Sequence, residues 1–591
     1  MTILIANIGT SDLAVKLSEE QGNFFIPIGF DRNEPNTKAA ESELDATELQ
    51  MWRDRWKLVS EKLYSLWQVK TFRSYTERLL QEYKAQPELW HNRIRPGRIL
   101  GVIEEAIKKS ASDVYIFVTD QPEFIEGEKN QGYNSDTIHL FAILKLWIER
   151  EFQDHLNVQK IVISQSISAI DQDGLFGEYY NFFKTLDANE MILISVKGGT
   201  PQMQTALRIQ AITSGIANQI YLEPQLSIKN LLAGKASECN KVSYWRYQRV
   251  QKYQTVKKLL KRWDFDGANV ILKEWDGILK SLERSKITGI ADSYYRLELA
   301  LYASEMAVAY FNLDAVAAAN CADYALRMTP PKDYRGIMID REKNPFRVCR
   351  SYEPALNLYT RCRIYWQLGQ AANFLFCFGS FYEEILHYLF VKLDGDRYFD
   401  EDRKPRWSLQ SWRVTQQDRQ LMNLFTDREQ ELKKKVNANF NPDWPYHRLD
   451  GRFSKRNFAE ALVLYRRPDK QEIWQRIIDS LNRLDYWFDK RNAVTHGAKG
   501  ISKERLDEIL TEDRKQYIPE AADPLQADPN EACWGSEILD EMGKIYRNVE
   551  IILDRTPCPF IDRNTPEYNQ APYYIYSEAK DWVIETLDRD R

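Results

Sequence analysis

A chain of 591 residues, 43% hydrophobic and 28% charged, is too long for one small folding unit, and about four are expected at this length. Its 25 glycines and 22 prolines exclude a collagen-like, low-complexity or largely disordered protein. Lysine and arginine total 81 against 86 aspartates and glutamates, so any nucleic-acid site must be a local patch.

The first 240 residues predict an α/β domain. Short apolar, β-branched runs alternate with helical stretches, and each run ends in a polar or glycine-containing turn, as in parallel β/α units. Because the runs are apolar almost throughout, we expect a mostly parallel, Rossmann-like sheet that is covered on both faces. The five predicted strands are residues 2–8, 113–119, 160–166, 191–197 and 219–223.

A long segment separates the first two predicted strands. It spans roughly a hundred residues of amphipathic helical pattern, which is too long for a simple crossover connection. The sequence therefore predicts a large helical insertion at about residues 35–110.

The chain from residue 241 onward predicts an all-α half, because apolar residues recur there at helical spacing. We divide it into a helical linker domain, 241–345, and a C-terminal helical domain, 346–591. The Pro-, Arg- and Lys-rich stretch 329–347 is the best candidate for a linker, and 437–453 is a second irregular stretch. The Pro-, Asn- and Tyr-rich tail from 555 to 577 is expected to wrap the surface before one last helix.

Cysteine spacing and the N-terminus favour a cytoplasmic protein. The seven cysteines form no close pair and no C-x-x-C, which argues against a disulfide framework and against a zinc site. No basic segment precedes the first apolar run, and the most apolar later run carries Glu383 and Glu384 in its middle, so we expect no membrane partner. The histidines lack metal-binding spacing, and we expect no required metal.

Two polar turns follow the first and fourth predicted strands, at the carboxyl ends where open α/β sheets bind ligands. Thr200 is placed to cap the next helix and Pro201 to begin it, so the free amides of that helix favour an anion. Lys197, Thr10 and Ser11 could add charge or hydroxyl contacts to a phosphate. The two turns are residues 7–12 (NIGTSD) and 197–203 (KGGTPQM).

An ordinary structural role for these turns stays open, since β-to-α turns use glycine for geometry and threonine for capping. Neither a dinucleotide-binding nor a P-loop motif is present, which favours phosphate binding without ATP hydrolysis. The segments 119–121 and 134–137 carry side chains that suit either helix capping or hydrogen bonds to a ribose or base.

A second chemical signal lies near the C-terminus, where Arg491, Asn492 and His496 follow a strongly helical stretch that Gly497 can end. Metal-free RNA cleavage needs a group that manages protons and a fixed cation for the charged phosphorane. On this chemistry His496 would transfer a proton or orient the 2′-hydroxyl, Arg491 would stabilise the phosphate, and Asn492 would position the substrate.

Helical geometry sets a condition on this pair. Five residues of about 100° each place the side chains of Arg491 and His496 roughly 140° apart, so they do not share one helix face. A site at a twofold axis, with both residues supplied by each subunit, would relieve the mismatch. The alternative is structural, with a histidine that interacts with the helix dipole and an arginine in a surface ion pair.

In their order along the chain, these motifs resemble the CARF-HEPN ancillary ribonucleases of type III CRISPR systems. The resemblance rests on NIGTSD, NSDTIHLFA, SVKGGTPQM, RWDFDGANVIL and RNAVTH. It implies a CARF domain at 1–240 and a HEPN bundle within 346–591. The insertion at about 35–110 and the tail after 555 match no part of the family pattern.

The resemblance implies a homodimer that binds a cyclic oligoadenylate and then cuts single-stranded RNA without a metal cofactor, leaving a 2′,3′-cyclic phosphate. It implies no role for DNA. Arg491, Asn492 and His496 would form the nuclease motif. The residues implied to contact the activator are Asn7, Gly9, Thr10, Ser11, Lys197, Gly198, Gly199, Thr200 and Met203.

Two other functions stay open at this point. The chain could be a cyclic-nucleotide-sensing module whose HEPN bundle serves dimerisation or partner binding without cleavage. It could also be a metabolic enzyme that acts on a nucleotide at the two turns, with the helical half as a lid. The intact RNAVTH motif argues against the first, and the lack of a catalytic triad or metal-binding set near the turns argues against the second.

Overall fold

The fold divides into two compact units, which are described separately here. One consists of Met1–Tyr253 and Glu274–Tyr294, and the other of Gln254–Lys273 and Tyr295–Arg591. The division 1–240, 241–345 and 346–591 stays a prediction. The computed structural model describes residues 2–16, 25–28, 46, 64–65, 67–125, 127–153, 156–187, 190–216, 218–225, 227–284, 287, 289–330, 344–348, 353–399, 407–436, 438–449, 451–497, 501–519, 525–561 and 571–590, without the side chains of 131, 228 and 492–497.

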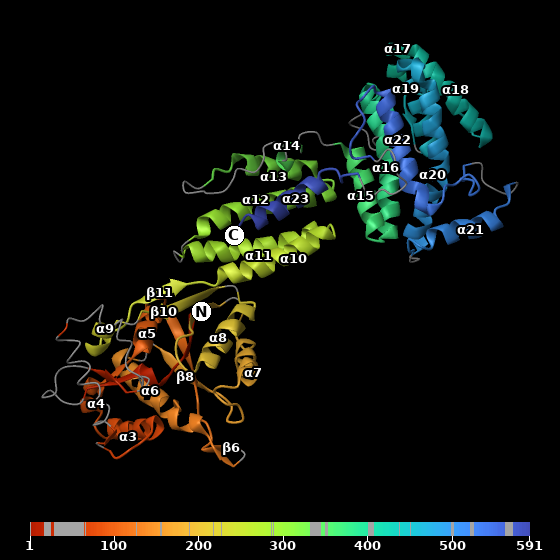
Figure 1. Cartoon of the computed structure of the whole chain (residues 1–591). Helices are drawn as coiled ribbons and strands as arrows, with labels where there is room; N and C mark the ends of the chain where they lie inside the picture. Colours follow the sequence, from red (N-terminus) through yellow and green to blue (C-terminus); the bar gives the residue numbers. More distant parts are fainter. Residues whose placement is uncertain are drawn as a thin grey trace. The chain divides into compact units, whose positions relative to one another are not determined.

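The first unit is built on a six-stranded sheet in the order β11-β10-β9-β1-β5-β8 (Figure 1). Five of its strands are parallel, and β11 (Cys239–Val242) adds an antiparallel edge that the sequence analysis missed. The mostly parallel sheet predicted from the apolar runs is confirmed. Its parallel strands are β1 (Thr2–Asn7), β5 (Ala111–Val118), β8 (Asn157–Val162), β9 (Met191–Ser195) and β10 (Gln219–Pro224).

The third predicted strand was placed about three residues too far along the chain. Residues Asn157 to Val162 pair with Asp113 to Val118, and the strand then gives way to a serine-rich turn. In that turn the hydroxyls of Ser164 and Ser166 lie 2.8 Å apart, and the Ile167 amide donates to the Ser164 carbonyl. Such side-chain hydrogen bonds compete with strand pairing, which explains the early end.

Both faces of the sheet are covered, as predicted. Alternate residues of β1 point to opposite sides, so Leu4 joins one buried cluster and Ile5 joins another. The Leu4 cluster includes α3 (Phe72–Ala85), α4 (Pro87–Arg93), α5 (Arg98–Lys108) and α6 (Ile138–Glu151). The Ile5 cluster includes α7 (Gln172–Phe183) and α8 (Pro201–Thr213).

The predicted insertion contains a strand as well as helices. Helices α3, α4 and α5 occupy its described part, but β4 (Ile94–Pro96) pairs with β2 (Leu13–Val15), which also pairs with β3 (Ile26–Pro27). Strands of two or three residues are too short to show a period, so no pattern in the sequence indicates them. Most of residues 35–63 lies outside the described residues.

The second unit is helical throughout its main elements, as predicted for the C-terminal half (Figure 1). Apolar residues of α20 (Gln471–Gly497) recur at 474, 477, 481, 484 and 488 and are all buried, which gives this helix one face for packing. Its other long helices include most of α12 (Ile290–Phe311), α13 (Ala315–Arg327), α15 (Pro354–Gln367), α16 (Ala371–Lys392), α18 (Arg419–Lys435), α19 (Arg452–Arg466), α22 (Ile538–Ile552) and α23 (Tyr576–Asp588).

Helix α16 is a core helix. By length and composition it could cross a membrane, but 67% of its apolar window is buried inside the protein. The end of the C-terminal tail is buried too, because Arg363 donates to the carbonyls of Ala571 and Pro572 and Tyr574 is only 3% exposed. This part of the tail therefore enters the helical core and does not wrap the surface. Residues 331–343 of the predicted linker and 562–570 of the tail lie outside the described residues.

Candidate functional site

A cavity of about 800 Å³ opens at the carboxyl ends of β1, β5 and β9, where the sequence predicted a ligand. Its volume falls within the range of small-molecule sites, about 300–1,000 Å³. Of the nine predicted contact residues, five line it, namely Gly9, Thr10, Gly199, Thr200 and Met203. The predicted segments 119–121 and 134–137 contribute Thr119, Ser135, Asp136 and Thr137 to its walls. The sequence analysis missed the remaining walls, which include Glu128, Lys129, Asn130, Ser168 and Ile170.

The other four predicted contact residues do not line the cavity. Asn7 is fully buried and accepts a hydrogen bond of 2.7 Å from the Tyr179 hydroxyl. The hydroxyl of Ser11 accepts a hydrogen bond from the Arg98 guanidinium. Lys197 and Gly198 follow β9, but neither is part of the cavity wall.

The two glycine-containing turns pack directly against each other. A side-chain carbon at Gly9 would lie 2.9 Å from the backbone nitrogen of Gly199. One at Gly198, which has φ of +140°, would overlap the carbonyl oxygen of Asn7. These glycines are therefore required for the approach of one turn to the other, whether or not a phosphate also binds there.

Thr200 caps helix α8, as predicted. Its hydroxyl accepts from the Met203 amide at 3.1 Å and donates to the Ala169 carbonyl at 2.5 Å. The cap joins the N-terminus of α8 to the loop that carries Ala169 on the same cavity. The positive end of the helix dipole thus faces the cavity and favours an anionic ligand.

Replacing Thr200 with valine should lower the free energy of unfolding by about 1–2 kcal/mol, because the cap and the bond to Ala169 are both lost. Chemical denaturation followed by circular dichroism measures this loss. Thr205→Val on the same helix is the matched control, since its hydroxyl, among the residues that the structure describes, bonds to the Pro201 carbonyl of the same helix. Equal stability of the two variants would contradict the prediction.

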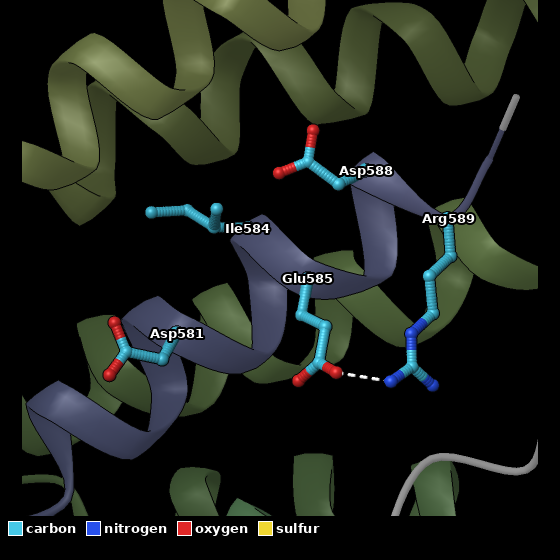
Figure 2. Close-up of a pocket in the computed structure, with 5 residues that line it drawn as sticks. All are labelled: Asp581, Ile584, Glu585, Asp588 and Arg589. Atoms are coloured by element: carbon cyan, nitrogen blue, oxygen red, sulfur yellow. Dashed lines mark hydrogen bonds and ion pairs between the residues drawn. The ribbon is translucent and has the colours of Figure 1, made fainter.

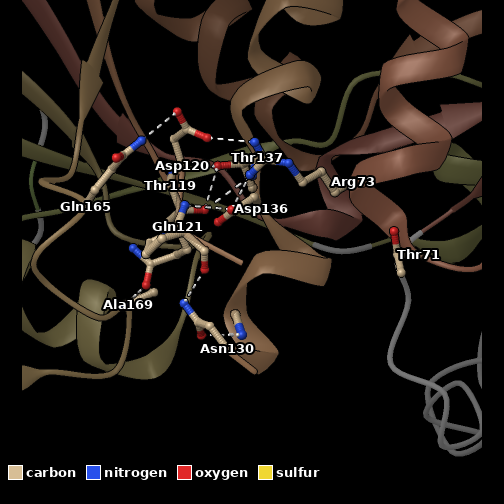
Figure 3. A network of polar contacts seen from close by, with 12 residues as sticks. Thr71, Arg73, Thr119, Asp120, Gln121, Asn130, Asp136, Thr137, Gln165 and Ala169 are labelled. Atoms are coloured by element: carbon tan, nitrogen blue, oxygen red, sulfur yellow. Dashed lines mark hydrogen bonds and ion pairs between the residues drawn. The ribbon is translucent and has the colours of Figure 1, made fainter. Parts of the chain in front are cut away.

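A polar network joins the cavity residues that lie between β5 and α6 (Figure 3). The Thr137 hydroxyl accepts from the Thr119 amide at 3.0 Å, and the Thr119 hydroxyl accepts from the Thr137 amide at 3.2 Å. Asp136 accepts from the Gln121 amide at 2.7 Å and is 1% exposed. These bonds brace the segment between β5 and α6, and the Thr137 side chain makes no capping bond to α6. Hydrogen bonds from the same side chains to a ribose or base stay a prediction.

Asp136 should make stability depend on pH. Burial raises its pKa from 3.8 to about 6, against the hydrogen bond from Gln121 and the charge of Arg73. The folded protein therefore holds this proton to a higher pH than the unfolded chain. The contribution of Asp136 to stability falls as the pH rises from 3.8 to about 6.

The Asp136→Asn variant should lose that dependence. Relative to the natural protein, its free energy of unfolding should increase as the pH rises through this window and should level off above about pH 6. Denaturation of both proteins at a series of pH values measures the difference. If the free energies of unfolding of the two proteins differed by the same amount at every pH in this window, the Asp136 carboxyl would titrate alike in the folded and unfolded states.

The second predicted site lies on α20. The Arg491 guanidinium stacks 4.3 Å from the centre of the Phe488 ring and lies against Gly379 of α16. Burial lowers the pKa of Arg491, and the carboxylates of Glu383 and Asp489 oppose that shift. Arg491 stays charged because the pKa of a guanidinium lies far above neutrality.

The backbone of Asn492 and His496 continues α20 to its end at Gly497, as the sequence predicted. Their side chains lie outside the described residues. The structure therefore places Arg491 and leaves the assembly of the three-residue motif as a prediction.

A buried ion-pair network lies within the two helical turns before Arg491. Asp485 accepts from the Tyr382 hydroxyl at 2.8 Å and pairs with Arg456 at 2.5 Å and with Arg452 at 3.2 Å. Arg452 also bonds Asp489 at 2.9 Å. Burial raises the pKa of Asp485 and the two arginines oppose it. The network fixes α19 and α16 to the part of α20 that carries the motif.

Neither metal binding nor the acidic end of the chain offers a competing site. Across the residues that the structure describes, no group of three or more His, Cys, Asp or Glu side chains could hold a metal ion. A shallow hollow of about 620 Å³ on α23 is lined by Asp581, Glu585, Asp588 and the Arg589 that pairs with Glu585 (Figure 2). Its carboxylates disfavour a phosphate ligand.

Comparison with known proteins returns a structural relative. Over the full length of both chains, the fold is similar to Csm6 of Enterococcus italicus, solved bound to cyclic hexa-2'-fluoro-hexa-dAMP, with 12% sequence identity and a TM-score of 0.47. No family model matches the sequence. No curated protein matches it.

Proposed function

We propose that this protein is a cyclic-oligoadenylate-activated, metal-independent endoribonuclease that cuts single-stranded RNA in type III CRISPR defence. The cavity of about 800 Å³ is the observation that carries the proposal. Residues of both predicted turns line it, and the N-terminus of α8 faces it, which favours a phosphodiester ligand. The motifs RNAVTH and SVKGGTPQM support the proposal through their resemblance to the family.

The activator would bind at a twofold axis of a homodimer. A ring of several nucleotides is larger than one such cavity, and two cavities joined across the axis would hold it. Binding activates the protein only if the ligand prefers the active arrangement, since equal affinity for both arrangements would shift nothing. A ligand that touches both protomers meets this condition when the two arrangements differ in the distance between the cavities.

Cleavage would proceed by attack of the RNA 2′-hydroxyl on the adjacent phosphorus. The new bond forms between that oxygen and phosphorus, the bond to the 5′-oxygen of the next nucleotide breaks, and a 2′,3′-cyclic phosphate remains. His496 would manage the proton of the 2′-hydroxyl or of the leaving oxygen. Arg491 would stabilise the charge on the phosphorane, and Asn492 would position the substrate.

A nuclease assay tests the proposal. Purified protein is incubated with labelled single-stranded RNA, EDTA and each member of a panel of cyclic oligoadenylates, in parallel with a His496→Ala variant. Cleavage should appear with one activator, should persist in EDTA and should fall at least about a hundredfold in the variant. Undiminished cleavage by the variant would assign the activity to other residues or to a contaminant.

The same assay separates the alternatives. Activator binding without cleavage under any condition would favour a sensing and dimerisation module. Absence of binding by every ring would reject the sensor as well as the nuclease.

A further inference from the structure

The insertion, which matches no part of the family pattern, reaches the cavity wall through Arg73. This residue lies in the first turn of α3, and its guanidinium pairs with Asp120 at 2.9 Å and with Asp136 at 2.5 Å. Its terminal carbon also lies 4.3 Å from the centre of the Tyr133 ring. Figure 3 shows Arg73 directed from the insertion toward both carboxylates.

The placement of Arg73 is unfavourable within its own helix. A cation in the first turn opposes the helix dipole, which favours anions there. The two carboxylates compensate for this, and both belong to the segment that joins β5 to α6 and not to the insertion. Arg73 therefore connects the insertion to the segment between β5 and α6, and it contributes little to the stability of α3 itself.

Asp136 connects this contact to the cavity. It lines the cavity and is 1% exposed, and the oxygen that pairs with Arg73 also accepts from the Gln121 amide. Residues on either side of it in sequence, Ser135 and Thr137, belong to the same wall. Arg73 thus fixes the carboxylate around which this wall is built.

We propose that Arg73 is a positioning residue for the activator, and that the insertion belongs to the binding site because α3 holds the 128–137 wall of the cavity in place. The proposal rests on the proposed function, since the ligand is the cyclic oligoadenylate inferred for this cavity. If the wall is already ordered in the free protein, it loses less conformational freedom when the activator binds. The protein therefore binds the activator with higher affinity. The polar groups of this wall suit the base edges and ribose hydroxyls of an adenylate.

Three variants of the full-length protein test the proposal. Arg73→Ala removes both ion pairs, and Arg73→Lys keeps the charge but loses the planar fork that reaches two carboxylates. Arg78→Ala is the matched control, because Arg78 lies on the same helix and, within the described part of the chain, contacts Glu82 and Gln81 at the surface. Thermal unfolding of each variant defines a temperature at which all are folded.

The first measurement needs no ligand. Amide hydrogen exchange of the free protein should be at least about tenfold faster in Arg73→Ala at Gln121 and across residues 128–137, and unchanged in β9. Arg73→Lys should fall between Arg73→Ala and the natural protein, and Arg78→Ala should match the natural protein. Unchanged exchange in Arg73→Ala would overturn the positioning role whether or not a nucleotide binds.

The second measurement is affinity for each cyclic oligoadenylate by calorimetry. Arg73→Ala should bind at least about tenfold more weakly, with Arg73→Lys intermediate. Faster exchange combined with full affinity would overturn the link between the wall and binding. If the natural protein binds no ring, the proposed function fails, and the inferred activator fails with it, while the exchange result still decides whether Arg73 orders the wall.

Discussion

Replacing Gly379 with alanine should reduce activated RNA cleavage at least about a hundredfold and leave the fold intact. Gly379 lies in the middle of α16, and an added methyl group would lie 2.5 Å from Cδ and 2.8 Å from Cζ of Arg491. An arginine side chain can swing away from such a clash. The variant should therefore fold with the proposed phosphate-stabilising group displaced.

The stability of Gly379→Ala provides a second test of this contact, because helix propensity alone would make the variant more stable. Alanine in place of glycine inside a helix normally adds about 0.5–1 kcal/mol of stability. Gly277→Ala should show that gain, since a methyl group there meets no atom of the described residues within 4 Å. Gly379→Ala should not show it, because the displaced Arg491 loses its stacking on Phe488.

A double-mutant cycle separates the contact from catalysis. In an Arg491→Ala background the methyl group meets no guanidinium, so Gly379→Ala should regain about 0.5–1 kcal/mol. Chemical denaturation of the four proteins measures the coupling without any RNA. Full cleavage by Gly379→Ala, or the same stability change in both backgrounds, would show that Arg491 does not occupy this position.

The main sheet could be read from the sequence because its strands are apolar and β-branched over several residues. Along runs such as TILIAN and MILIS, apolar residues do not alternate with polar ones. This pattern is typical of strands buried on both faces of the sheet. Short strands give no such signal. Pairing of β2 with β4 depends on contacts between Leu13–Val15 and Ile94–Pro96, which are remote in sequence.

The candidate sites were predictable to the extent that local sequence determines them. Turn position and capping placed Thr200 correctly, since both follow from neighbouring residues. The roles of Arg73 and Gly379 arise from contacts with Asp136 and Arg491, which lie far away along the chain. Burial also changes chemistry that sequence leaves open, as in the raised pKa of Asp136.

Replacing Gly198 with alanine should strongly destabilise the first unit. Its φ of +140° is costly for any residue with a side chain, and an added methyl group would overlap the Asn7 carbonyl oxygen and lie 3.2 Å from the Ile8 Cα. These are backbone atoms at the end of β1, so they cannot swing away. We expect Gly198→Ala to lower the free energy of unfolding by about 3 kcal/mol or more and to abolish activator binding.

Two further alanine variants separate the two causes of this loss of stability, which are backbone strain at positive φ and the close approach of the two turns. Gly215 has φ of +77° and open space around it, so Gly215→Ala should cost only about 1 kcal/mol from backbone strain. Gly9 has an ordinary extended backbone but meets the Gly199 nitrogen at 2.9 Å, so Gly9→Ala measures the close approach alone. If Gly198→Ala were no more destabilising than Gly215→Ala, the two turns would have room between them. The glycines would then be needed only for the close approach of the ligand, and not for the packing of one turn against the other.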